Sequence, residues 1–215
     1  MIVNENVTDY LRSLIKEEDD FLGGIERQAR KDHVPIVKPE TKEFLKVLVK
    51  MNQPMKILEV GTAVGFSSLY MHKFQPEGGT VVTIERNEGR IQKAKDNFAR
   101  AGVQDAVTLM EGDAAEILAE LSGTFDFIFM DAAKGQYIRF FEHILRLLPV
   151  GGILVSDNVL QDGDIVKSRY AIERRDRTIH KRMREYLYTL KQHPLLDTSV
   201  LPLGDGVAVS MKTGE

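Results

Sequence analysis

Apolar residues recur in two alternating spacings from residue 54 onward. Short continuous apolar runs predict strands, and segments whose apolar residues are three or four positions apart predict helices. The predicted strands cover 56–60, 80–84, 107–111, 125–130 and 152–156. The predicted helices between them cover 66–74, 87–101, 114–121 and 136–148. This alternation is typical of βαβ units wound around a parallel sheet.

The two ends of the chain depart from that alternation. Near the N-terminus, apolar residues at helical spacing follow Asn6, a candidate N-cap, and Pro39 opens a second helix. Near the other end, a basic helix over roughly 174–192 precedes two strand-like runs, near 197–202 and 206–211. A Gly-Asp-Gly turn joins these runs and predicts a hairpin, so we expect an antiparallel strand near the edge of the sheet.

Length and composition indicate one α/β domain over residues 1–215, with 1–50 as a helical extension and 51–215 as the core. No apolar run approaches the roughly 20 residues of a membrane span. The N-terminus lacks the basic flank and apolar stretch of a secretion signal. The absence of cysteine excludes disulfides, thiolate metal sites and a cysteine nucleophile. We therefore expect a cytoplasmic protein that does not contact membranes.

Charge is unevenly distributed along the chain. The formal net charge is −3, yet residues 167–184 hold eight basic and two acidic residues, or +6, which leaves −9 for the rest. A basic patch on an acidic body indicates a polyanionic partner. A solvated helix face explains the same charges equally well, so charge alone leaves both interpretations open.

Oxygen-bearing side chains follow two of the predicted strands. Asp131 comes directly after the run 125–130, and Asp157 and Asn158 come directly after 152–156. If these strands are parallel neighbours, their ends lie about 4.8 Å apart. Three oxygen ligands then converge at the carboxyl edge of the sheet, where open α/β folds bind ligands. Such a set suits Mg²⁺, Mn²⁺ or Ca²⁺. Taken singly, Asp131 is explained by helix capping and Asp157-Asn158 by a turn.

The turn after the first predicted strand indicates a cofactor site. Gly61 and Gly65 frame it, and glycines there allow a ligand to approach the backbone closely. The spacing matches neither a Walker A loop nor the dinucleotide fingerprint. Glu59 disfavours a pyrophosphate, while Glu85, at the end of the second strand, suits two ribose hydroxyls. Asp113 and Ala114 follow the third strand and are placed to face an adenine. Together these residues favour S-adenosylmethionine.

Four motifs in this order resemble those of the metal-dependent O-methyltransferases, the family of the catechol and caffeoyl-CoA enzymes. The likeness spans about residues 30–212 and implies a Rossmann-like class I methyltransferase fold. That fold has a seven-stranded, mostly parallel sheet with an antiparallel C-terminal strand and helices on both faces. The motifs are ILEVGTAVGFS from Ile57 to Ser67, Thr83-Ile84-Glu85, Phe129-Met130-Asp131-Ala132-Ala133-Lys134 and Ser156-Asp157-Asn158.

The resemblance also implies a role for each site residue. The metal ligands would be Asp131, Asp157 and Asn158, with Lys134 as the catalytic lysine beside Asp131. The cofactor would contact Val37, Glu59, Gly61, Thr62, Ser67, Glu85, Asp113, Ala114 and Asp131. Without this resemblance, we would interpret Lys134 as an ordinary surface lysine. Where the plant enzymes carry an acid that touches the cofactor, this chain has only Ala133.

Within the family, the motifs most resemble those of bacterial members that methylate 5-hydroxyuridine in tRNA. The segments that carry this likeness are His33-Val34-Pro35-Ile36, Ile84 to Glu88, Asp131 to Tyr137 and Asp157 to Leu160. We therefore expect transfer of a methyl group to the tRNA wobble nucleoside, giving 5-methoxyuridine. Arg174, Arg175 and Arg177 are the candidate contacts to the tRNA backbone. The alternatives are a small catechol-like acceptor and a non-catalytic RNA- or nucleotide-binding module. The resemblance also implies a homodimer.

Metal and lysine have separable roles in this chemistry. A catechol and a 5-hydroxyuridine both carry two oxygens on adjacent ring carbons, which chelate a divalent ion in a five-membered ring. The ion acidifies the hydroxyl and orients it toward the sulfonium methyl. A lysine acts as the base only if burial and nearby cations depress its ordinary pKa of about 10.4. Otherwise Lys134 stabilises the oxyanion, and the sequence leaves both roles open.

Overall fold

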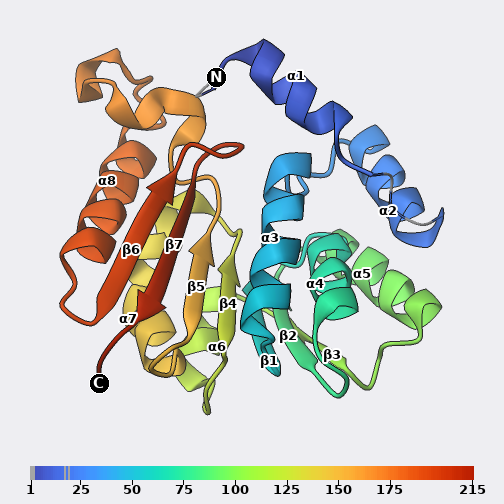
Figure 1. Ribbon diagram of the computed structural model, residues 1–215. Coiled ribbons are helices and arrows are strands. Elements are labelled where there is room, and N and C mark those ends of the chain that lie inside the picture. Colours follow the sequence, from blue (N-terminus) through green and yellow to red (C-terminus); the bar gives the residue numbers. More distant parts are fainter. Residues whose placement is uncertain (1–2, 17, 19) are drawn as a thin grey trace.

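The computed structural model describes residues 3–16, 18 and 20–215. Within them, seven strands form one sheet in the order β3-β2-β1-β4-β5-β7-β6, as Figure 1 shows. The first five strands are parallel, while β7 runs antiparallel to β5 and pairs with β6 as a hairpin. The strands are β1 (Lys56–Val60), β2 (Thr80–Glu85), β3 (Val107–Glu111), β4 (Phe127–Met130), β5 (Ile153–Ser156), β6 (Leu196–Leu201) and β7 (Val207–Lys212). The predicted fold class is confirmed.

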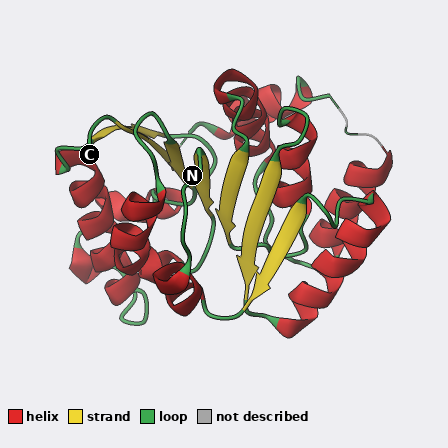
Figure 2. Ribbon diagram, turned by 90° about the horizontal axis from the view of Figure 1, so that it is seen from below, coloured by secondary structure: helices red, strands yellow, loops and turns green. Residues whose placement is uncertain are grey.

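Helices cover both faces of the sheet, which lies between them in Figure 2. Alternate strand residues supply the two cores, because successive side chains point to opposite faces. Leu58 and Val60 pack with one layer, and Ile57 packs with the other. The first layer is α6 (Ala114–Glu120), α7 (Tyr137–Leu147) and α8 (Arg177–Gln192). The second is α2 (Asp20–Lys31), α3 (Pro39–Asn52), α4 (Phe66–Phe74) and α5 (Glu88–Ala101).

The N-terminal helices differ in detail from the prediction. Helix α1 (Glu5–Ser13) is capped by Asn4 rather than Asn6, because the Asn4 side chain accepts a hydrogen bond from the backbone N–H of Asn6. Pro39 opens the third helix rather than the second, since α2 intervenes. Helix α1 buries none of its residues, and an ion pair of 3.0 Å between Arg12 and Glu40 connects it to α3.

Two elements start at least two residues later than predicted. Strand β4 begins at Phe127 rather than 125, because the Phe125 N–H bonds the Leu147 carbonyl and the Asp126 carboxylate accepts the N–H groups of Met55 and Lys56. Helix α8 begins at Arg177 rather than 174. Short 3-10 helices occupy part of the preceding loop, namely η2 (Gln161–Val166) and η3 (Arg169–Ala171). Among the described residues, no helix is both long and apolar enough to span a bilayer.

The β6–β7 turn supports the loop that follows β5. The backbone N–H groups of Val159 and Leu160 donate to the carbonyls of Gly206 and Asp205, both at 3.0 Å. Gly206 has a φ of +92°, which favours glycine. A Cβ at this position would lie 2.3 Å from Leu160 Cγ and 2.7 Å from the Leu160 nitrogen. The close approach of turn and loop therefore depends on Gly206.

Replacing Gly206 with alanine tests this dependence. We expect Gly206→Ala to lower the free energy of unfolding by at least about 2 kcal/mol more than Gly102→Ala, because overpacking adds to backbone strain. Gly102 is the matched control, since its φ is +67° and a Cβ there would meet nothing within 4 Å. Urea denaturation followed by circular dichroism measures both. Equal losses would show that Leu160 tolerates the added carbon.

Candidate active site

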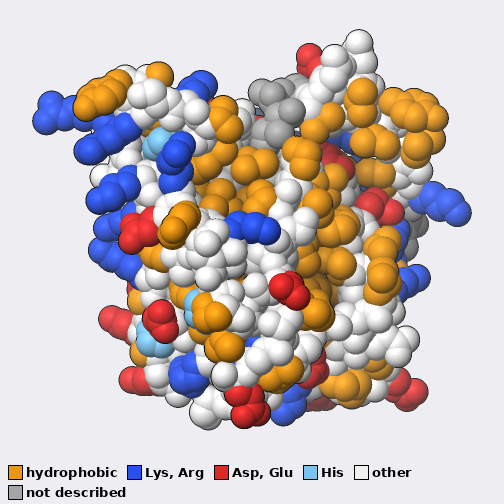
Figure 3. Space-filling view, turned by 60° about the vertical axis from the view of Figure 1, so that its left-hand side comes forward, with side chains coloured by type: hydrophobic (Ala, Val, Ile, Leu, Met, Phe, Trp, Pro, Cys, Tyr) orange, Lys and Arg blue, Asp and Glu red, His pale blue; other side chains and the backbone are white. Residues whose placement is uncertain are grey.

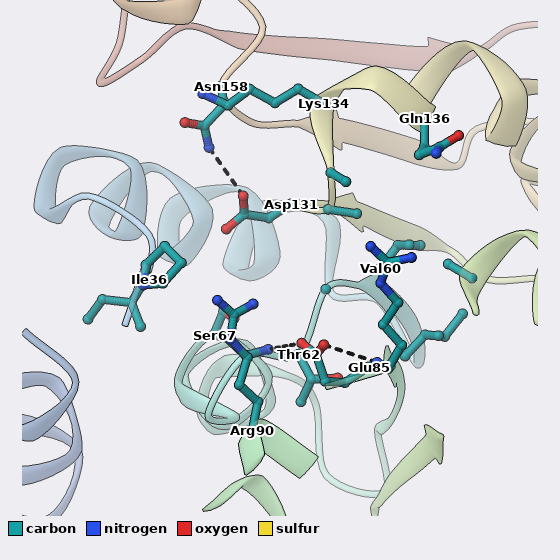
Figure 4. A pocket seen from close by; sticks show the side chains of 18 of the residues that line it. Ile36, Val60, Thr62, Ser67, Glu85, Arg90, Asp131, Lys134, Gln136 and Asn158 are labelled. Atoms are coloured by element: carbon teal, nitrogen blue, oxygen red, sulfur yellow. Dashed lines mark hydrogen bonds between the residues drawn. The ribbon is translucent and has the colours of Figure 1, made fainter. Parts of the chain in front are cut away.

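A cavity of about 450 Å³ opens at the carboxyl edge of the parallel strands. Its walls come from the segment before α3, the β1–α4 turn, the ends of β2 and β4, and the start of α5 (Figure 4). Most residues predicted from the sequence to form the site line this cavity: Val37, Gly61, Thr62, Ser67, Glu85, Asp113, Ala114, Asp131, Lys134 and Asn158. Strand ends distant in the sequence thus supply a single site.

The β1–α4 turn passes close under the end of β4. Gly61 has a φ of +111°, and a Cβ there would lie 2.3 Å from the carbonyl oxygen of Asp131. Gly65 has a φ of +81° and faces the Phe98 ring, where a Cβ would lie 2.6 Å from the nearest ring carbon. These glycines let α4 begin at the cavity, and the first N–H groups of a helix have no intrahelical partner.

Glu85 is held in place by backbone donors at the end of β2. One carboxylate oxygen accepts the N–H of Ala63, and the other accepts the N–H groups of Arg86 and Asn87, each at 3.0 Å. Figure 4 shows the carboxylate at the edge of the cavity. A fixed acid with lone pairs left over suits a pair of ribose hydroxyls. The structure places Glu85 in the cavity wall, and its role as the ribose-binding acid stays a prediction.

Glu59 does not line the cavity, contrary to the expectation from the sequence. It is fully buried beneath the turn, because the pleat directs it with Ile57 toward the α4 side of the sheet. Ser68 and Thr83 both donate hydrogen bonds to the same carboxylate oxygen, the latter at 2.6 Å. Burial raises the pKa of Glu59 to about 7. Glu59 therefore connects α4, through Ser68, with β2, through Thr83.

The ends of β4 and β5 bring the three predicted metal ligands together. The strands are parallel neighbours in which Met130 pairs with Ser156, so Asp131 and Asp157 leave the sheet side by side. The Asn158 amide donates to the Asp131 carboxylate at 3.2 Å (Figure 4). The Asn158 backbone N–H donates to the Asp157 carboxylate at 2.8 Å. Asp157 does not line the cavity and lies just behind the other two.

Electrostatics at this point favour a cation. Burial raises the pKa of Asp131 to about 6. Burial, with the neighbouring Asp131 charge as the second cause, raises the pKa of Asp157 well above its ordinary value. No three Asp, Glu, His or Cys side chains converge in the part of the chain that the structure describes. The donor set is thus two carboxylates and an amide, which fits a hard divalent ion whose other positions go to water or substrate.

Lys134 begins the short helix η1 (Lys134–Gln136) on the far side of Asp131. Its side chain lines the cavity, and its charge lowers the pKa of Asp131 against the effect of burial. The Arg182 side chain donates to the Gly135 carbonyl at 3.1 Å, which fixes η1 against α8. The charge of Lys134 beside Asp131 and Asn158 is therefore available to bind an oxyanion.

Further residues line the cavity that the sequence interpretation missed. Arg90 extends into it from the first turn of α5, and Gln136 and Phe140 line it beyond Lys134. Pro35 and Ile36 close the side next to Val37. The sequence signals were weak: Gln136 follows the Lys134 motif, and Arg90 lies five positions after Glu85.

The arginines predicted to bind RNA are not equivalent. Arg175 forms ion pairs with Glu173 at 3.0 Å and Asp176 at 3.5 Å, and Arg177 donates to the Ile172 carbonyl at 3.1 Å. Arg174 is exposed and makes no hydrogen bond or ion pair with any described residue. The exposed side chains of Arg169 and Lys181 likewise make no hydrogen bond or ion pair with any described residue. Figure 3 shows lysines and arginines gathered on this side of the molecule.

Comparisons with known proteins agree with this geometry. A family model described as O-methyltransferase matches residues 15–213. The chain belongs to this O-methyltransferase family. It is 34% identical over 168 residues to a catechol O-methyltransferase from Niastella koreensis, covering 75% of this chain and 76% of that protein.

Solved structures extend the likeness to the whole fold. A Staphylococcus aureus structure, described as a candidate caffeoyl-CoA O-methyltransferase, has a TM-score of 0.89 and 34% identity, covering 97% of this chain and 100% of the other. A Bacillus cereus O-methyltransferase in complex with SAH has a TM-score of 0.84 and 26% identity, covering 97% of both chains. This chain is therefore an enzyme, an S-adenosylmethionine-dependent O-methyltransferase, which argues against the alternative of a non-catalytic module.

The buried Glu59 predicts a specific pH dependence of stability. Its pKa in the folded protein, about 7, exceeds its ordinary value of 4.5. The stability it contributes is therefore complete below pH 4.5 and is lost as the pH rises through 7. At about 1.4 kcal/mol per pKa unit, this loss amounts to about 3 kcal/mol. We expect Glu59→Gln to lack it, so that the variant gains on the wild type as the pH rises.

Urea denaturation between pH 4.5 and 8.5, without cofactor or divalent ions, measures the difference. Glu142→Gln, at an exposed carboxyl, is the control and should follow the wild type at every pH. Parallel curves for Glu59→Gln and the wild type would contradict the assignment of a raised pKa to Glu59.

Proposed function

We propose that this O-methyltransferase requires a divalent cation and methylates one of two oxygens on adjacent carbons of a ring. The observation that carries the proposal is the convergence of Asp131, Asp157 and Asn158 beside the cofactor cavity. Mg²⁺ is the proposed ion, and Mn²⁺ or Ca²⁺ accept the same ligands. When bound, the ion supplies Lewis acidity and a template for the two acceptor oxygens.

The cofactor is proposed to lie across the cavity from Glu85 to Asp131. Glu85 binds the ribose hydroxyls, and Asp113 and Ala114 flank the adenine. The methionine part lies along the β1–α4 turn, where the cavity wall includes Val37 and the predicted residues Gly61, Thr62 and Ser67. This orientation directs the sulfonium methyl toward Asp131, the point where the acceptor hydroxyl is held.

Lys134 is proposed as the catalytic lysine. It lies on the acceptor side of Asp131, opposite the cofactor residues in Figure 4. Its two possible roles are alternatives: a positively charged lysine stabilises the acceptor oxyanion before methyl transfer, whereas a neutral amine takes up the hydroxyl proton. Gln136 and Phe140, from the same stretch, border the space into which the acceptor ring would enter.

Two acceptors fit this chemistry. The name of the Niastella koreensis relative favours a small catechol-like metabolite. The surface of this chain supports 5-hydroxyuridine at the tRNA wobble position. Three side chains that are unpaired among the described residues lie there, Arg169 and Arg174 in the segment before α8 and Lys181 on α8 itself, and α8 packs on η1, which holds Lys134. Both acceptors suit the metal site, so the choice between them depends on groups outside it. Because of the unpaired cations near α8, we propose the tRNA nucleoside as the acceptor, giving 5-methoxyuridine. A catechol is the alternative, and the comparisons favour it.

The subunit arrangement is a separate proposal. Helix α1 exposes apolar side chains at Val7, Tyr10, Leu11 and Leu14, each at least 44% accessible. A helix with an apolar stripe and no buried residues has a face available for a second copy of the chain. We propose a homodimer on this basis, and the cytoplasmic location stays a prediction.

Asp157→Asn tests the metal site apart from the cofactor site. We expect turnover to fall by at least about 100-fold, beyond the 10–100-fold loss typical of outer-shell residues. Binding of S-adenosylhomocysteine should be unchanged, because Asp157 does not line the cavity. Calorimetry and a methyl-transfer assay measure the two effects.

The exposed acid Asp164, paired with Lys167, is the control, and Asp164→Asn should retain activity. Excess EDTA should abolish wild-type turnover, and added Mg²⁺ should restore it. Full activity in EDTA would contradict metal dependence.

Arg174→Glu distinguishes the two acceptors. The enzyme is assayed with tRNA purified from a strain that lacks the enzyme and, in a separate reaction, with a catechol. If tRNA is the acceptor, we expect the variant to raise the KM for tRNA several-fold. Its tRNA affinity should also fall less steeply with salt concentration, by about the amount that one lost phosphate contact accounts for. Turnover of the catechol should not change. Lys56→Glu, at the opposite edge of the sheet, should affect neither. Wild-type turnover of the catechol with untouched tRNA would exclude the RNA acceptor.

A further inference from the structure

Arg90 is a cation in the cofactor cavity that has no partner among the described residues. The Asn87 side chain accepts the Arg90 backbone N–H at 3.0 Å, which fixes the first turn of α5. The guanidinium lines the cavity and makes no hydrogen bond or ion pair with those residues. Neighbouring Arg86 differs, since it donates to Asp113 at 3.2 Å. A half-buried guanidinium without an acceptor is poorly satisfied.

The acids of the cavity do not supply that acceptor. Glu85 already accepts three backbone N–H groups, and Asp113 is paired with Arg86. Arg90 lies close enough to Asp131 to lower the pKa of that carboxyl, yet the two form no ion pair. Arg90 is therefore free to pair with an anionic group of a ligand that enters the cavity.

Only one group of the cofactor is anionic. S-adenosylmethionine has no phosphate, so its negative charge is the carboxylate of the methionine part. In Figure 4, the Arg90 guanidinium lies on the side of the cavity that holds Ser67 and Glu85, while Lys134 lies beyond Asp131. Of the two arginines on the cofactor side, Arg86 is paired with Asp113 and Arg90 is not paired with any described residue. A guanidinium can hold a carboxylate through two parallel hydrogen bonds.

We propose that Arg90 binds the methionine carboxylate of the cofactor, together with Ser67 and the N-terminal N–H groups of α4. The inference rests on the proposed placement of the ribose at Glu85, since that placement directs the methionine part toward Ser67. Arg90 would thereby fix the end of the tail, so that the sulfonium between ribose and carboxylate has a single position. This contact between Arg90 and the carboxylate does not depend on the metal or on the identity of the acceptor.

Two ligands that differ in the tail provide the test. S-adenosylhomocysteine carries the carboxylate, whereas 5′-methylthioadenosine keeps the adenosine and sulfur but lacks the amino acid. We expect Arg90→Gln to weaken S-adenosylhomocysteine by about 10- to 100-fold, the loss typical of a charged hydrogen-bonded pair. Affinity for 5′-methylthioadenosine should change less than about twofold. Calorimetry without divalent ions or acceptor measures both, and Arg90→Lys should recover part of the loss.

Control variants separate the possible failures. Lys95→Gln, elsewhere on α5 and paired with Glu111, should alter neither affinity. Glu85→Gln should weaken both ligands, because both carry the ribose; if it weakens neither, the proposed placement of the cofactor is wrong. If Glu85→Gln behaves as expected but Arg90→Gln weakens both ligands equally, or neither, the assignment of Arg90 is overturned and the placement stands. An unchanged urea midpoint excludes misfolding of either variant.

Discussion

The active site depends on the pairing of β4 with β5. Met130 pairs with Ser156, so the residues that follow them leave the sheet together. The Tyr137 hydroxyl reinforces this pairing, because it lies 3.0 Å from the Met130 carbonyl and 3.1 Å from the Asp157 carbonyl. A slip of one residue would direct the two carboxylates to opposite faces of the sheet. A buried tyrosine at the start of α7 therefore connects core packing to the ligand geometry.

Charge in the cavity is organised by burial and by backbone donors. Glu85 keeps its place through three N–H groups, whereas Asp131 and Asp157 are held close together at some electrostatic cost. The two carboxylates repel each other in the free protein, and a bound cation would relieve that repulsion. Arg90 and Lys134 stand on opposite sides of Asp131, so in the proposed arrangement Asp131 separates the cofactor from the acceptor.

The sequence predicted the fold and most of the residues that line the cavity, because strand ends are well determined by apolar runs. It placed Asp131, Asp157 and Asn158 together correctly, since parallel neighbours share an edge. It misplaced Glu59, because the direction of a strand side chain relative to the following turn depends on packing against α4. Which arginine is free also depends on tertiary contacts, and these single out Arg174 from its neighbours.

The contact between Gly206 and Leu160 joins two segments that are far apart in the sequence. Val159 and Leu160 donate hydrogen bonds to the β6–β7 turn, and β7 itself pairs with β5, so the loop after β5 takes its final shape only when the hairpin is in place. A substitution in the hairpin can therefore disturb Asp157 and Asn158, which directly precede Val159, from a distant part of the chain.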